Sequence, residues 1–305
     1  MTKPDILQIS PYAEWDQTPL DAAYHVHHLS AAPDLSEIRA IATTGGAGVS
    51  DAIIQACPKL ELIAVNGVGY DAINLGLCKA RGVSVTNTPG VLDGDCADLA
   101  LAMALGLSRA VPAADAHARS GAWEAANFPL QRRFFGAKAG ILGLGRIGSE
   151  IARRLEGFDM QIAYSARSEK PVAYTYIPDP VALAAHVDFL FVVTLANAET
   201  RHIVNAEVLR ALGPNGMLIN ISRAANIDED ALLTALETNQ IAGAALDVFE
   251  GEPAINPRFK PLANVLLQPH QGSATEATRR AMGQLQRDNL AAHFSGQPLL
   301  TAVTL

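Results

Sequence analysis

Short runs of apolar and β-branched residues alternate with helical patterns along almost the whole of this chain. In the first third the strand-like runs are DILQIS, AIATT, LELIAVN and VSVTNT. A second series starts at AGILG and continues with MQIAYS, FLFVVT, GMLINIS, AGAALDV and VLLQP. Parallel strands need a helix-sized connection between them, so this alternation predicts an α/β architecture built on parallel sheets. The five or six later strands predict one doubly wound sheet with helices between its strands.

Length and charge narrow the class of protein. A chain of 305 residues is long enough for about two domains, and its 49% hydrophobic content is that of a globular protein. The 23 Lys and Arg against 31 Asp and Glu give a net charge of −8, which argues against nucleic acid or an anionic membrane surface as the main partner. Since no apolar run approaches the roughly 18 residues of a membrane span, no membrane contact is expected.

The opening residues and the cysteines indicate the compartment. The start, MTKPDILQIS, lacks the long apolar stretch of a secretory signal. Cys57, Cys78 and Cys96 lie far apart and form no C-x-x-C pair, which fits buried thiols in a reducing cytosol. We therefore expect a cytoplasmic protein.

Two helical stretches carry information about packing. Residues 95–109 are apolar on nearly every side, so this helix is expected to be buried in a core or between subunits. Residues 275–294 have apolar side chains on one face and end at FSGQP, a Gly–Pro stop. Residues 121–136 are aromatic and basic without a clear period, and they predict a connecting loop.

The strand expected at residues 139–142 runs into the sequence GLGRIG and then into an amphipathic helix. G-x-G-x-x-G between a strand and a helix is typical of a dinucleotide-binding turn, and an ordinary glycine-rich turn is the alternative. Gly143 would allow the tight turn, Gly145 would let the backbone approach a pyrophosphate, and Gly148 would let helix and strand pack closely. The helix N-terminus would present its amides to the phosphates. The residues expected to bind the cofactor here are Gly143, Leu144, Gly145, Arg146, Ile147 and Gly148.

The end of the next strand indicates which dinucleotide binds. An NAD site usually has Asp or Glu about 20 residues after the glycines to hold the ribose 2′-hydroxyl. Here the strand MQIAYS ends in Ser165, and Arg167 and Ser168 follow before any acidic residue. Guanidinium and hydroxyl groups can bind a 2′-phosphate, which a carboxylate would repel. Ser165, Arg167 and Ser168 therefore predict NADP(H), the alternative being that Arg167 is a solvated surface charge.

Candidate catalytic residues follow three of the later strands. Arg223 follows GMLINIS, Glu252 follows AGAALDV, and His270 follows VLLQP. Open α/β sheets bind ligands at the carboxyl ends of their strands. Taken singly, Arg223 and Glu252 would be surface charges and His270 a core histidine. Together, in this order and behind these strands, they predict a catalytic set.

Five stretches in a fixed order carry a family resemblance: VNGVGYDAIN, NTPGVL, GILGLGRIG, LDVFEGEP and LLQPHQGS. On these motifs the chain resembles the D-2-hydroxyacid dehydrogenases along essentially its whole length. Within that family, SARSEKP and HFSGQPLLTAV are similar to the glyoxylate/hydroxypyruvate reductase branch, including the plant-type hydroxyphenylpyruvate reductases.

The resemblance implies a fold. The chain would form two Rossmann-like, doubly wound parallel-sheet α/β domains, discontinuous in sequence, with the active site in the inter-domain cleft. Residues 1–97 together with 276–305 would form a flavodoxin-like substrate-binding domain, and residues 98–275 the NADP(H)-binding Rossmann domain. A homodimer is expected, with the helix at 95–109 in the core of its interface.

The resemblance also implies a role for each catalytic residue. Arg223 would bind the substrate carboxylate and polarise the keto group. His270 would give its proton to the substrate oxygen as hydride reaches the carbon, and Glu252 would hydrogen-bond to His270 and favour its protonated form. In the reverse direction neutral His270 would be the base. The nicotinamide supplies the hydride, so no metal is expected.

Further contacts are carried over position by position. The backbone amides of Val68 and Gly69 would meet the substrate carboxylate. The residues expected to line the cofactor near the nicotinamide are Thr194, Ile221, Asp247 and Gly272. The chain departs from the family pattern at Ala224, where Gly is usual, and at Gln271, where an aliphatic residue is usual. Gln271 could add a polar contact near the site, which bears on the size of substrate that the enzyme prefers.

The residues together with this resemblance imply an NADPH-dependent reductase of a small 2-oxo acid, glyoxylate or hydroxypyruvate first, that makes the D-2-hydroxy acid. Two alternatives remain open. One is the same chemistry on a bulkier aryl 2-oxo acid such as hydroxyphenylpyruvate. The other is a non-catalytic, dinucleotide-sensing interaction protein, like the corepressors that resemble this family.

His25, His27 and His28 form an H-x-H-H pattern that raises the question of a metal site. Histidine ligands in metal sites are usually joined by acidic or cysteine ligands, and no such residue stands nearby in the sequence. The pattern therefore favours a half-exposed strand or turn, and no metal is expected.

Overall fold

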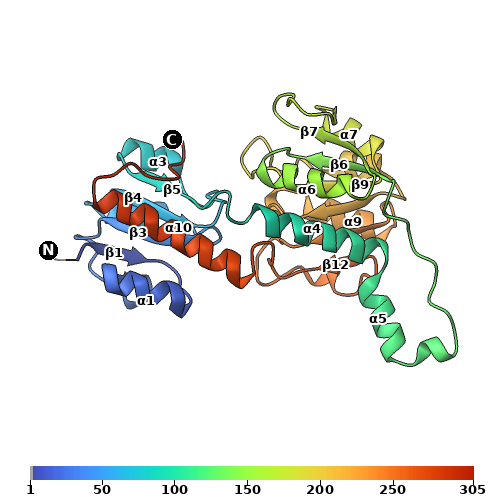
Figure 1. The fold of residues 1–305 in the computed structure, drawn as a ribbon, viewed down its shortest axis with the longest axis horizontal. Coiled ribbons are helices and arrows are strands. Elements are labelled where there is room, and N and C mark those ends of the chain that lie inside the picture. Colours follow the sequence, from blue (N-terminus) through green and yellow to red (C-terminus); the bar gives the residue numbers. More distant parts are fainter. Residues whose placement is uncertain (1–2) are drawn as a thin grey trace. The chain divides into compact units, whose positions relative to one another are not determined.

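The computed structural model describes residues 3–305 and divides the chain into two compact units (Figure 1). One unit holds the chain up to Leu92 together with Thr275–Leu305, and the other holds Asp93–Ala274. Within each unit the named strands pair in parallel, which confirms the expected fold class of two parallel-sheet α/β domains. The domain boundary expected after residue 97 falls inside helix α4 (Asp93–Ser108), which belongs entirely to the second unit.

The first unit is built on a five-stranded sheet in the order β2-β1-β3-β4-β5. Alternate residues of its strands enter separate hydrophobic clusters on the two faces, Leu7 on one and Ile6 on the other. Its strands are β1 (Asp5–Gln8), β2 (His25–His28), β3 (Ala40–Thr44), β4 (Leu62–Asn66) and β5 (Ser84–Thr86). Its helices are α1 (Glu14–Ala23), α2 (Asp51–Ala56), α3 (Leu75–Ala80), α10 (Glu276–Phe294) and the short 3-10 helix η1 (Leu29–Ala31).

Helix α10 returns from the end of the chain to pack within this first unit, as Figure 1 shows. Gln286 is buried and donates from Nε2 to the carbonyl oxygens of Thr43 and Ala64, at 3.2 and 2.7 Å, which ties the helix to β3 and β4. Gly283 lets the helix approach α1 closely, because a Cβ atom there would overlap the buried carboxylate of Asp16.

The second unit is built on a seven-stranded sheet in the order β12-β11-β10-β9-β6-β7-β8. The chain runs outward from β6 to β8, crosses to β9 on the other side of β6, and runs outward again to β12. In such sheets ligands bind where the strand order reverses. The strands are β6 (Lys138–Leu142), β7 (Gln161–Ser165), β8 (Thr175–Tyr176), β9 (Phe189–Val192), β10 (Met217–Asn220), β11 (Gly243–Leu246) and β12 (Val265–Leu267).

The helices of the second unit connect these strands and lead into them. After α4 come α5 (Val111–Arg119), α6 (Arg146–Glu156), α7 (Pro180–His186), α8 (Ala206–Leu212) and α9 (Glu229–Glu237). Three short 3-10 helices are η2 (Ala122–Glu124), η3 (Ala224–Asn226) and η4 (Pro257–Phe259). Apart from η2, residues 121–136 have no regular secondary structure.

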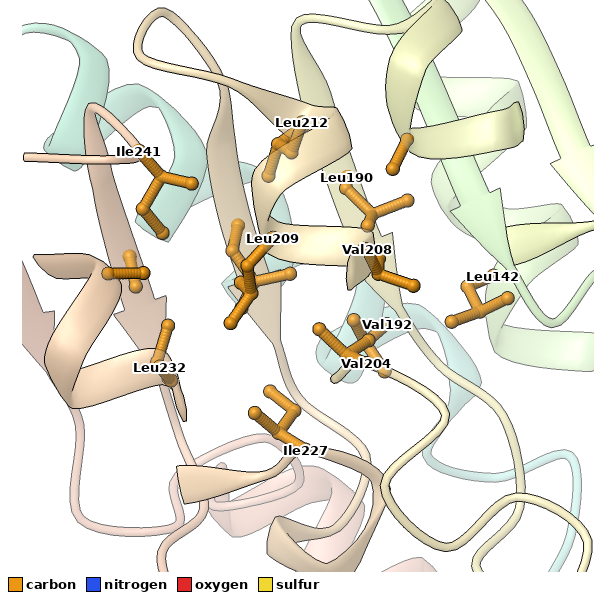
Figure 2. Close-up of a cluster of buried hydrophobic side chains, with 14 of the residues drawn as sticks. Leu142, Leu190, Val192, Val204, Val208, Leu209, Leu212, Ile227, Leu232 and Ile241 are labelled. Atoms are coloured by element: carbon orange, nitrogen blue, oxygen red, sulfur yellow. The ribbon is translucent and has the colours of Figure 1, made fainter. Parts of the chain in front are cut away.

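A large hydrophobic cluster lies between this sheet and the helices α7, α8 and α9 (Figure 2). Leu190 and Val192 enter it from alternate positions of β9, and Leu209 enters it from α8. Full burial of such a side chain contributes roughly 1.5–3 kcal/mol. Leu142 and Val192 are the last residues of their strands, so the cluster fixes where the loops leave the sheet.

Helix α4 packs against α6 and against β10, β11 and β12 (Figure 1). Its expected burial is confirmed, with Ala100, Met103 and Ala104 at most 1% exposed. Three of its leucines, Leu99, Leu105 and Leu107, are only partly buried. Among residues 3–305 no single helix is long and apolar enough to cross a membrane, although α4 and α5 together, bent by 58°, meet the same criterion of length and composition.

Candidate active site

The carboxyl ends of the strands in the second unit lie along one edge of the sheet, and the loops that follow them carry the predicted site residues. The loop after β12 carries His270, the loop after β11 carries Asp247 and Glu252, and the loop after β10 carries Arg223. Further along the edge are the glycine turn after β6 and the turn with Arg167 after β7. Parallel pairing thus brings positions from across the chain to one edge.

Two glycines of the turn after β6 are required by packing. Gly143 has a φ of 108°, and a Cβ atom there would lie 2.8 Å from the backbone nitrogen of Thr194 in the loop after β9. At Gly148 a Cβ atom would lie 2.3 Å from the carbonyl oxygen of Gly143, so glycine lets α6 pack this closely on the turn. Steric packing accounts for both glycines without reference to a ligand.

Gly145 differs, because nothing lies within 4 Å of the place that its Cβ would take. Its φ of −93° is open to any residue, so neither strain nor packing requires glycine here. The residue caps α6, whose first-turn amides have no acceptor inside the helix. The open backbone at Gly145 beside these amides and the positive end of the helix dipole fits a pyrophosphate.

The three predicted 2′-phosphate ligands at the end of β7 and in the turn after it differ in their exposure. Arg167 and Ser168 are exposed, and within residues 3–305 their side chains have no hydrogen-bond or ion-pair partner. Ser165 is buried, and its hydroxyl donates to the carbonyl oxygen of Pro178 at 2.8 Å. A guanidinium and one hydroxyl are therefore available to an anion, whereas the Ser165 hydroxyl already has a partner inside the fold.

His270 and Glu252 come from the loops after two neighbouring strands, and their side chains meet. Nδ1 of His270 lies 2.7 Å from Oε2 of Glu252. The other oxygen, Oε1, accepts a hydrogen bond from the amide of Phe249 at 2.7 Å, so the carboxylate is held on both sides. The two side chains are 43% and 31% exposed, so the pair is accessible. With Nδ1 engaged, Nε2 is the ring nitrogen of His270 left to exchange a proton.

A buried carboxylate shapes the backbone at His270. Asp247 accepts hydrogen bonds from the amides of Gln271 and Gly272 at 2.6 and 2.8 Å. The backbone carbonyl oxygen of Asp247 also accepts a hydrogen bond from the amide of His270 at 3.0 Å. His270 has a φ of 55°, in the left-handed region that side chains rarely adopt, and this clamp holds it there. Burial raises the pKa of Asp247, and the hydrogen bonds from the two amides oppose that rise.

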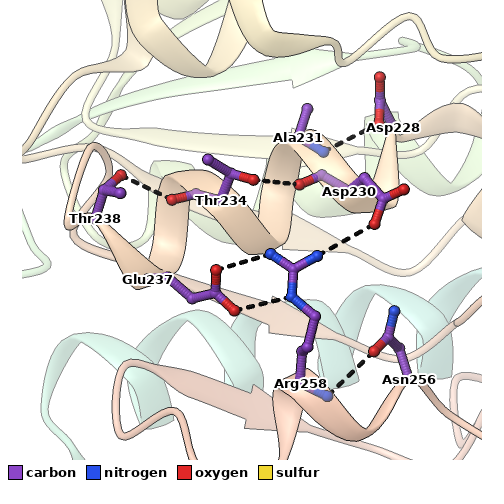
Figure 3. Close-up of polar contacts among 8 residues, drawn as sticks. All are labelled: Asp228, Asp230, Ala231, Thr234, Glu237, Thr238, Asn256 and Arg258. Carbon is purple, nitrogen blue, oxygen red and sulfur yellow. Dashed lines mark hydrogen bonds and ion pairs between the residues drawn. The ribbon is translucent and has the colours of Figure 1, made fainter.

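The loop that carries Glu252 is anchored to helix α9 at its far end. As Figure 3 shows, the guanidinium of Arg258 in η4 donates to both oxygens of Glu237, at 2.9 and 2.7 Å, and to Asp230 at 3.2 Å. The next residue, Phe259, is 1% exposed and belongs to the hydrophobic cluster of Figure 2. Glu252 therefore lies in a short loop whose far end is held by ion pairs and by the core.

Arg223 lies in the loop that follows β10, and two buried asparagines shape this loop. Nη1 of Arg223 donates to the carbonyl oxygen of Ser222 at 2.8 Å. Asn220 accepts from the amide and hydroxyl of Ser222, at 3.0 and 2.7 Å, and donates to the carbonyl oxygen of Arg223 at 3.3 Å. Asn226 donates to the Ser222 hydroxyl at 3.0 Å and to the carbonyl oxygen of Thr194 at 2.9 Å. Sequence reasoning missed both asparagines, although an Asn at a buried strand end is a signal for such a network.

The model of the NAD binding domain of the D-isomer specific 2-hydroxyacid dehydrogenases matches residues 101–272. This match covers more than half of the chain and includes the glycine turn, Arg223, Glu252 and His270. The chain belongs to the D-isomer specific 2-hydroxyacid dehydrogenase family.

The similarity of this dehydrogenase to known proteins extends over both units. A hydroxyphenylpyruvate reductase of Plectranthus scutellarioides is 42% identical over 307 residues, 98% of each chain. The structure of a 2-hydroxyacid dehydrogenase from Ketogulonicigenium vulgare Y25 matches with a TM-score of 0.94 and 60% identity over 100% of this chain and 99% of that chain. An NADPH-dependent glyoxylate/hydroxypyruvate reductase from Sinorhizobium meliloti, solved with NADP and malonate, matches with a TM-score of 0.95 and 40% identity over 99% and 97% of the two chains.

The remaining predicted site residues of the dehydrogenase lie in both units. Val68 and Gly69 belong to the first unit, in the loop after β4, where the carbonyl oxygen of Val68 accepts from Nδ2 of Asn87 at 2.9 Å. The backbone amides of Val68 and Gly69 have no acceptor in the described part of the chain, so they are available to a carboxylate. Thr194 and Ile221 lie in the second unit, after β9 and β10.

Proposed function

We propose that this dehydrogenase reduces small 2-oxo acids, glyoxylate or hydroxypyruvate first, to D-2-hydroxy acids with NADPH. The observation that carries the proposal is the 2.7 Å contact between Nδ1 of His270 and Oε2 of Glu252. Reduction of a 2-oxo acid needs a proton donor for the new alkoxide and a cation for the carboxylate. The His270–Glu252 pair provides the proton donor. Arg223, the cation, lies in a loop at the same edge of the sheet.

Each side chain then has a separate task. Arg223 binds the substrate carboxylate and polarises the keto oxygen. Nε2 of His270 gives its proton to that oxygen, because Nδ1 faces Glu252. Glu252 stabilises the imidazolium before the transfer. When bound, the nicotinamide supplies the hydride that the carbonyl carbon receives.

The residues that would hold the cofactor lie in two adjacent loops. The amides of the glycine turn, with the open backbone of Gly145, suit the pyrophosphate. Arg167 and Ser168 suit the 2′-phosphate, because they are exposed and have no partner among residues 3–305. The NADP bound to the Sinorhizobium meliloti reductase supports the same choice.

A substrate panel tests the proposal. We would measure kcat/KM for glyoxylate, hydroxypyruvate, pyruvate, hydroxyphenylpyruvate and 2-ketogluconate, each with NADPH and with NADH. We expect glyoxylate or hydroxypyruvate with NADPH to give the highest value, and hydroxypyruvate to give D-glycerate. A clear preference for hydroxyphenylpyruvate would select the aryl alternative, which the Plectranthus scutellarioides relative favours. An L-product, or a preference for the polyhydroxylated 2-ketogluconate, would overturn the proposal.

We also propose a homodimer, formed through helix α4 and the segment between α4 and β6. Val111, Trp123, Leu130 and Phe135 in this segment are 54%, 66%, 102% and 55% exposed. Large apolar side chains gathered on an exposed segment are a mark of an interface, and a second copy is the partner that closes it. Sedimentation equilibrium should give twice the mass of one chain, and Trp123→Ser should shift the equilibrium toward the monomer. A monomeric native chain would contradict the homodimer.

We further propose a cytoplasmic location. Cys57, Cys78 and Cys96 are all buried, and none of them forms a disulfide. Burial raises the pKa of both the Cys57 and the Cys78 thiol, so these groups stay in the unreactive form. Such thiols suit a reducing compartment. Cell fractionation tests the proposal, and recovery outside the cytosolic fraction would contradict it.

A further inference from the structure

An aspartate and two histidines of the first unit meet at the edge of its sheet, far along the chain from the catalytic residues. Strands β1 and β2 pair in parallel with Asp5 opposite His25. His25 and His27 share a face of β2, because side chains two residues apart on a strand point the same way. Oδ1 of Asp5 lies 2.8 Å from Nδ1 of His25 and 2.7 Å from Nε2 of His27. The acidic partner that the local sequence lacks is therefore supplied by the neighbouring strand.

We propose that Asp5, His25 and His27 bind a divalent transition-metal ion of the zinc type. Two imidazole nitrogens and one carboxylate oxygen are ligands that Zn²⁺ prefers, and water completes the coordination. The three ligand atoms lie within 4.8 Å of one another. Around a tetrahedral ion with bonds of about 2.1 Å, ligand atoms would be roughly 3.4 Å apart. A small outward movement of each side chain is enough to admit the ion.

The surroundings allow this movement. Strand β2 is the edge strand of the sheet, and the His25 side chain is 67% exposed while that of His27 is 24% exposed. The two rings already lie side by side, with centroids 4.5 Å apart. The side chain of Asp5 is 31% exposed, so all three side chains reach solvent at the edge strand.

The charge at this place also favours a cation. The carboxylate of Asp5 contacts both imidazoles. A second carboxylate, Asp34, lies close enough to His27 for the two groups to interact electrostatically. Both carboxylates contribute negative potential around the two imidazoles.

The competing explanation is that Asp5 only accepts hydrogen bonds from the two histidines and that the cluster joins β1 to β2 without an ion. The two explanations differ in their effect on stability. An ion that binds the folded chain stabilises it by RT ln(1 + [L]/Kd), whereas a plain hydrogen-bonded cluster gives no dependence on the metal concentration.

Calorimetric titration of the EDTA-treated full-length chain with Zn²⁺ tests the proposal. We expect one ion per chain and a rise in the melting temperature with Zn²⁺. His25→Ala, at an exposed position, and Asp5→Asn should each weaken binding by at least about tenfold, because each removes a ligand. His28→Ala is the matched control, because His28 points to the other face of the same strand, and its binding should equal that of the native chain.

A further variant separates this cluster from the active site. His270→Asn removes the imidazole of the catalytic pair and should leave Zn²⁺ binding and the shift in melting temperature unchanged. Loss of binding in His270→Asn would assign the ion to that pair and overturn the proposal. The absence of specific binding by the native chain, or native affinity in both His25→Ala and Asp5→Asn, would overturn it as well.

Discussion

Nδ1 of His270 lies 2.7 Å from Oε2 of Glu252, and the amide of Phe249 holds the other oxygen of that carboxylate. This contact fixes the imidazole by one nitrogen and leaves Nε2 without this partner. The two side chains meet because β11 and β12 are parallel neighbours, so the loops that follow them begin side by side. The proposed proton donor therefore depends on the arrangement of two loops and not on one local motif.

Replacement of His270 by Asn should lower kcat by about 10²- to 10⁴-fold, because the amide is polar but cannot act as an acid near neutral pH. Binding of NADPH, followed by the fluorescence of the reduced nicotinamide, should stay unchanged because His270 does not belong to the glycine turn. A kcat close to that of the native chain would remove His270 from the mechanism.

Replacement of Gly145 by Ala should separate cofactor binding from folding. The added methyl group meets no protein atom, so the free energy of unfolding should change by less than about 1 kcal/mol. The same methyl group blocks the approach of the pyrophosphate to the helix amides, so the Kd for NADPH should rise by about tenfold or more. Gly148→Ala is the contrast, because its methyl group would meet the carbonyl oxygen of Gly143 and should destabilise the fold. Unchanged NADPH affinity in Gly145→Ala would mean that the phosphates bind elsewhere.

Replacement of Arg167 by Ala should weaken NADPH binding by about 10- to 100-fold, the range expected for a lost charge-assisted hydrogen bond. NADH lacks the 2′-phosphate, so its affinity should change little. Arg153→Ala, which removes an exposed arginine paired with Glu150 on α6, controls for the loss of positive charge. Equal weakening of both cofactors by Arg167→Ala would contradict its role in choosing NADPH.

Replacement of Asp247 by Asn should change how the stability depends on pH. Burial raises the pKa of Asp247 above its usual 3.8, so the folded chain holds this proton more tightly than the unfolded chain does. The resulting stabilisation is complete below the unfolded value and is lost as the pH rises through the raised folded value. Because Asn does not ionise, the difference in free energy of unfolding should shift in favour of the variant as the pH rises above the usual 3.8. Urea unfolding over a series of rising pH values measures the difference, and a constant value would contradict the role of burial.

Much of the second unit could be predicted from the sequence because its strands are buried on both faces. Strands β9 and β10 read as the continuous apolar runs FLFV and MLIN, and all their residues are buried. When such strands pair in parallel, the residues that follow each strand in the sequence lie at one edge of the sheet. That rule placed Arg223, Glu252 and His270 together before any contact was known, and the family resemblance supplied their roles.

Contacts between segments distant in sequence could not be predicted in this way. Asp5 meets His27 through the register of β1 and β2, which no local pattern encodes. The hydrogen bond from Asn226 to the carbonyl oxygen of Thr194 joins the loops after β9 and β10, and no local pattern encodes this contact either. The hydrogen bond from the Ser165 hydroxyl to the carbonyl oxygen of Pro178 is another contact that the local sequence does not reveal.

The most direct test is the initial rate of NADPH oxidation by the purified chain with glyoxylate, compared with the same reaction with NADH and with the His270→Asn variant. We expect oxidation that requires glyoxylate, a higher kcat/KM with NADPH than with NADH, and a large loss of rate in the variant. If the native chain binds NADPH but oxidises it with no 2-oxo acid of the panel, the reductase proposal is contradicted and a dinucleotide-sensing role takes its place.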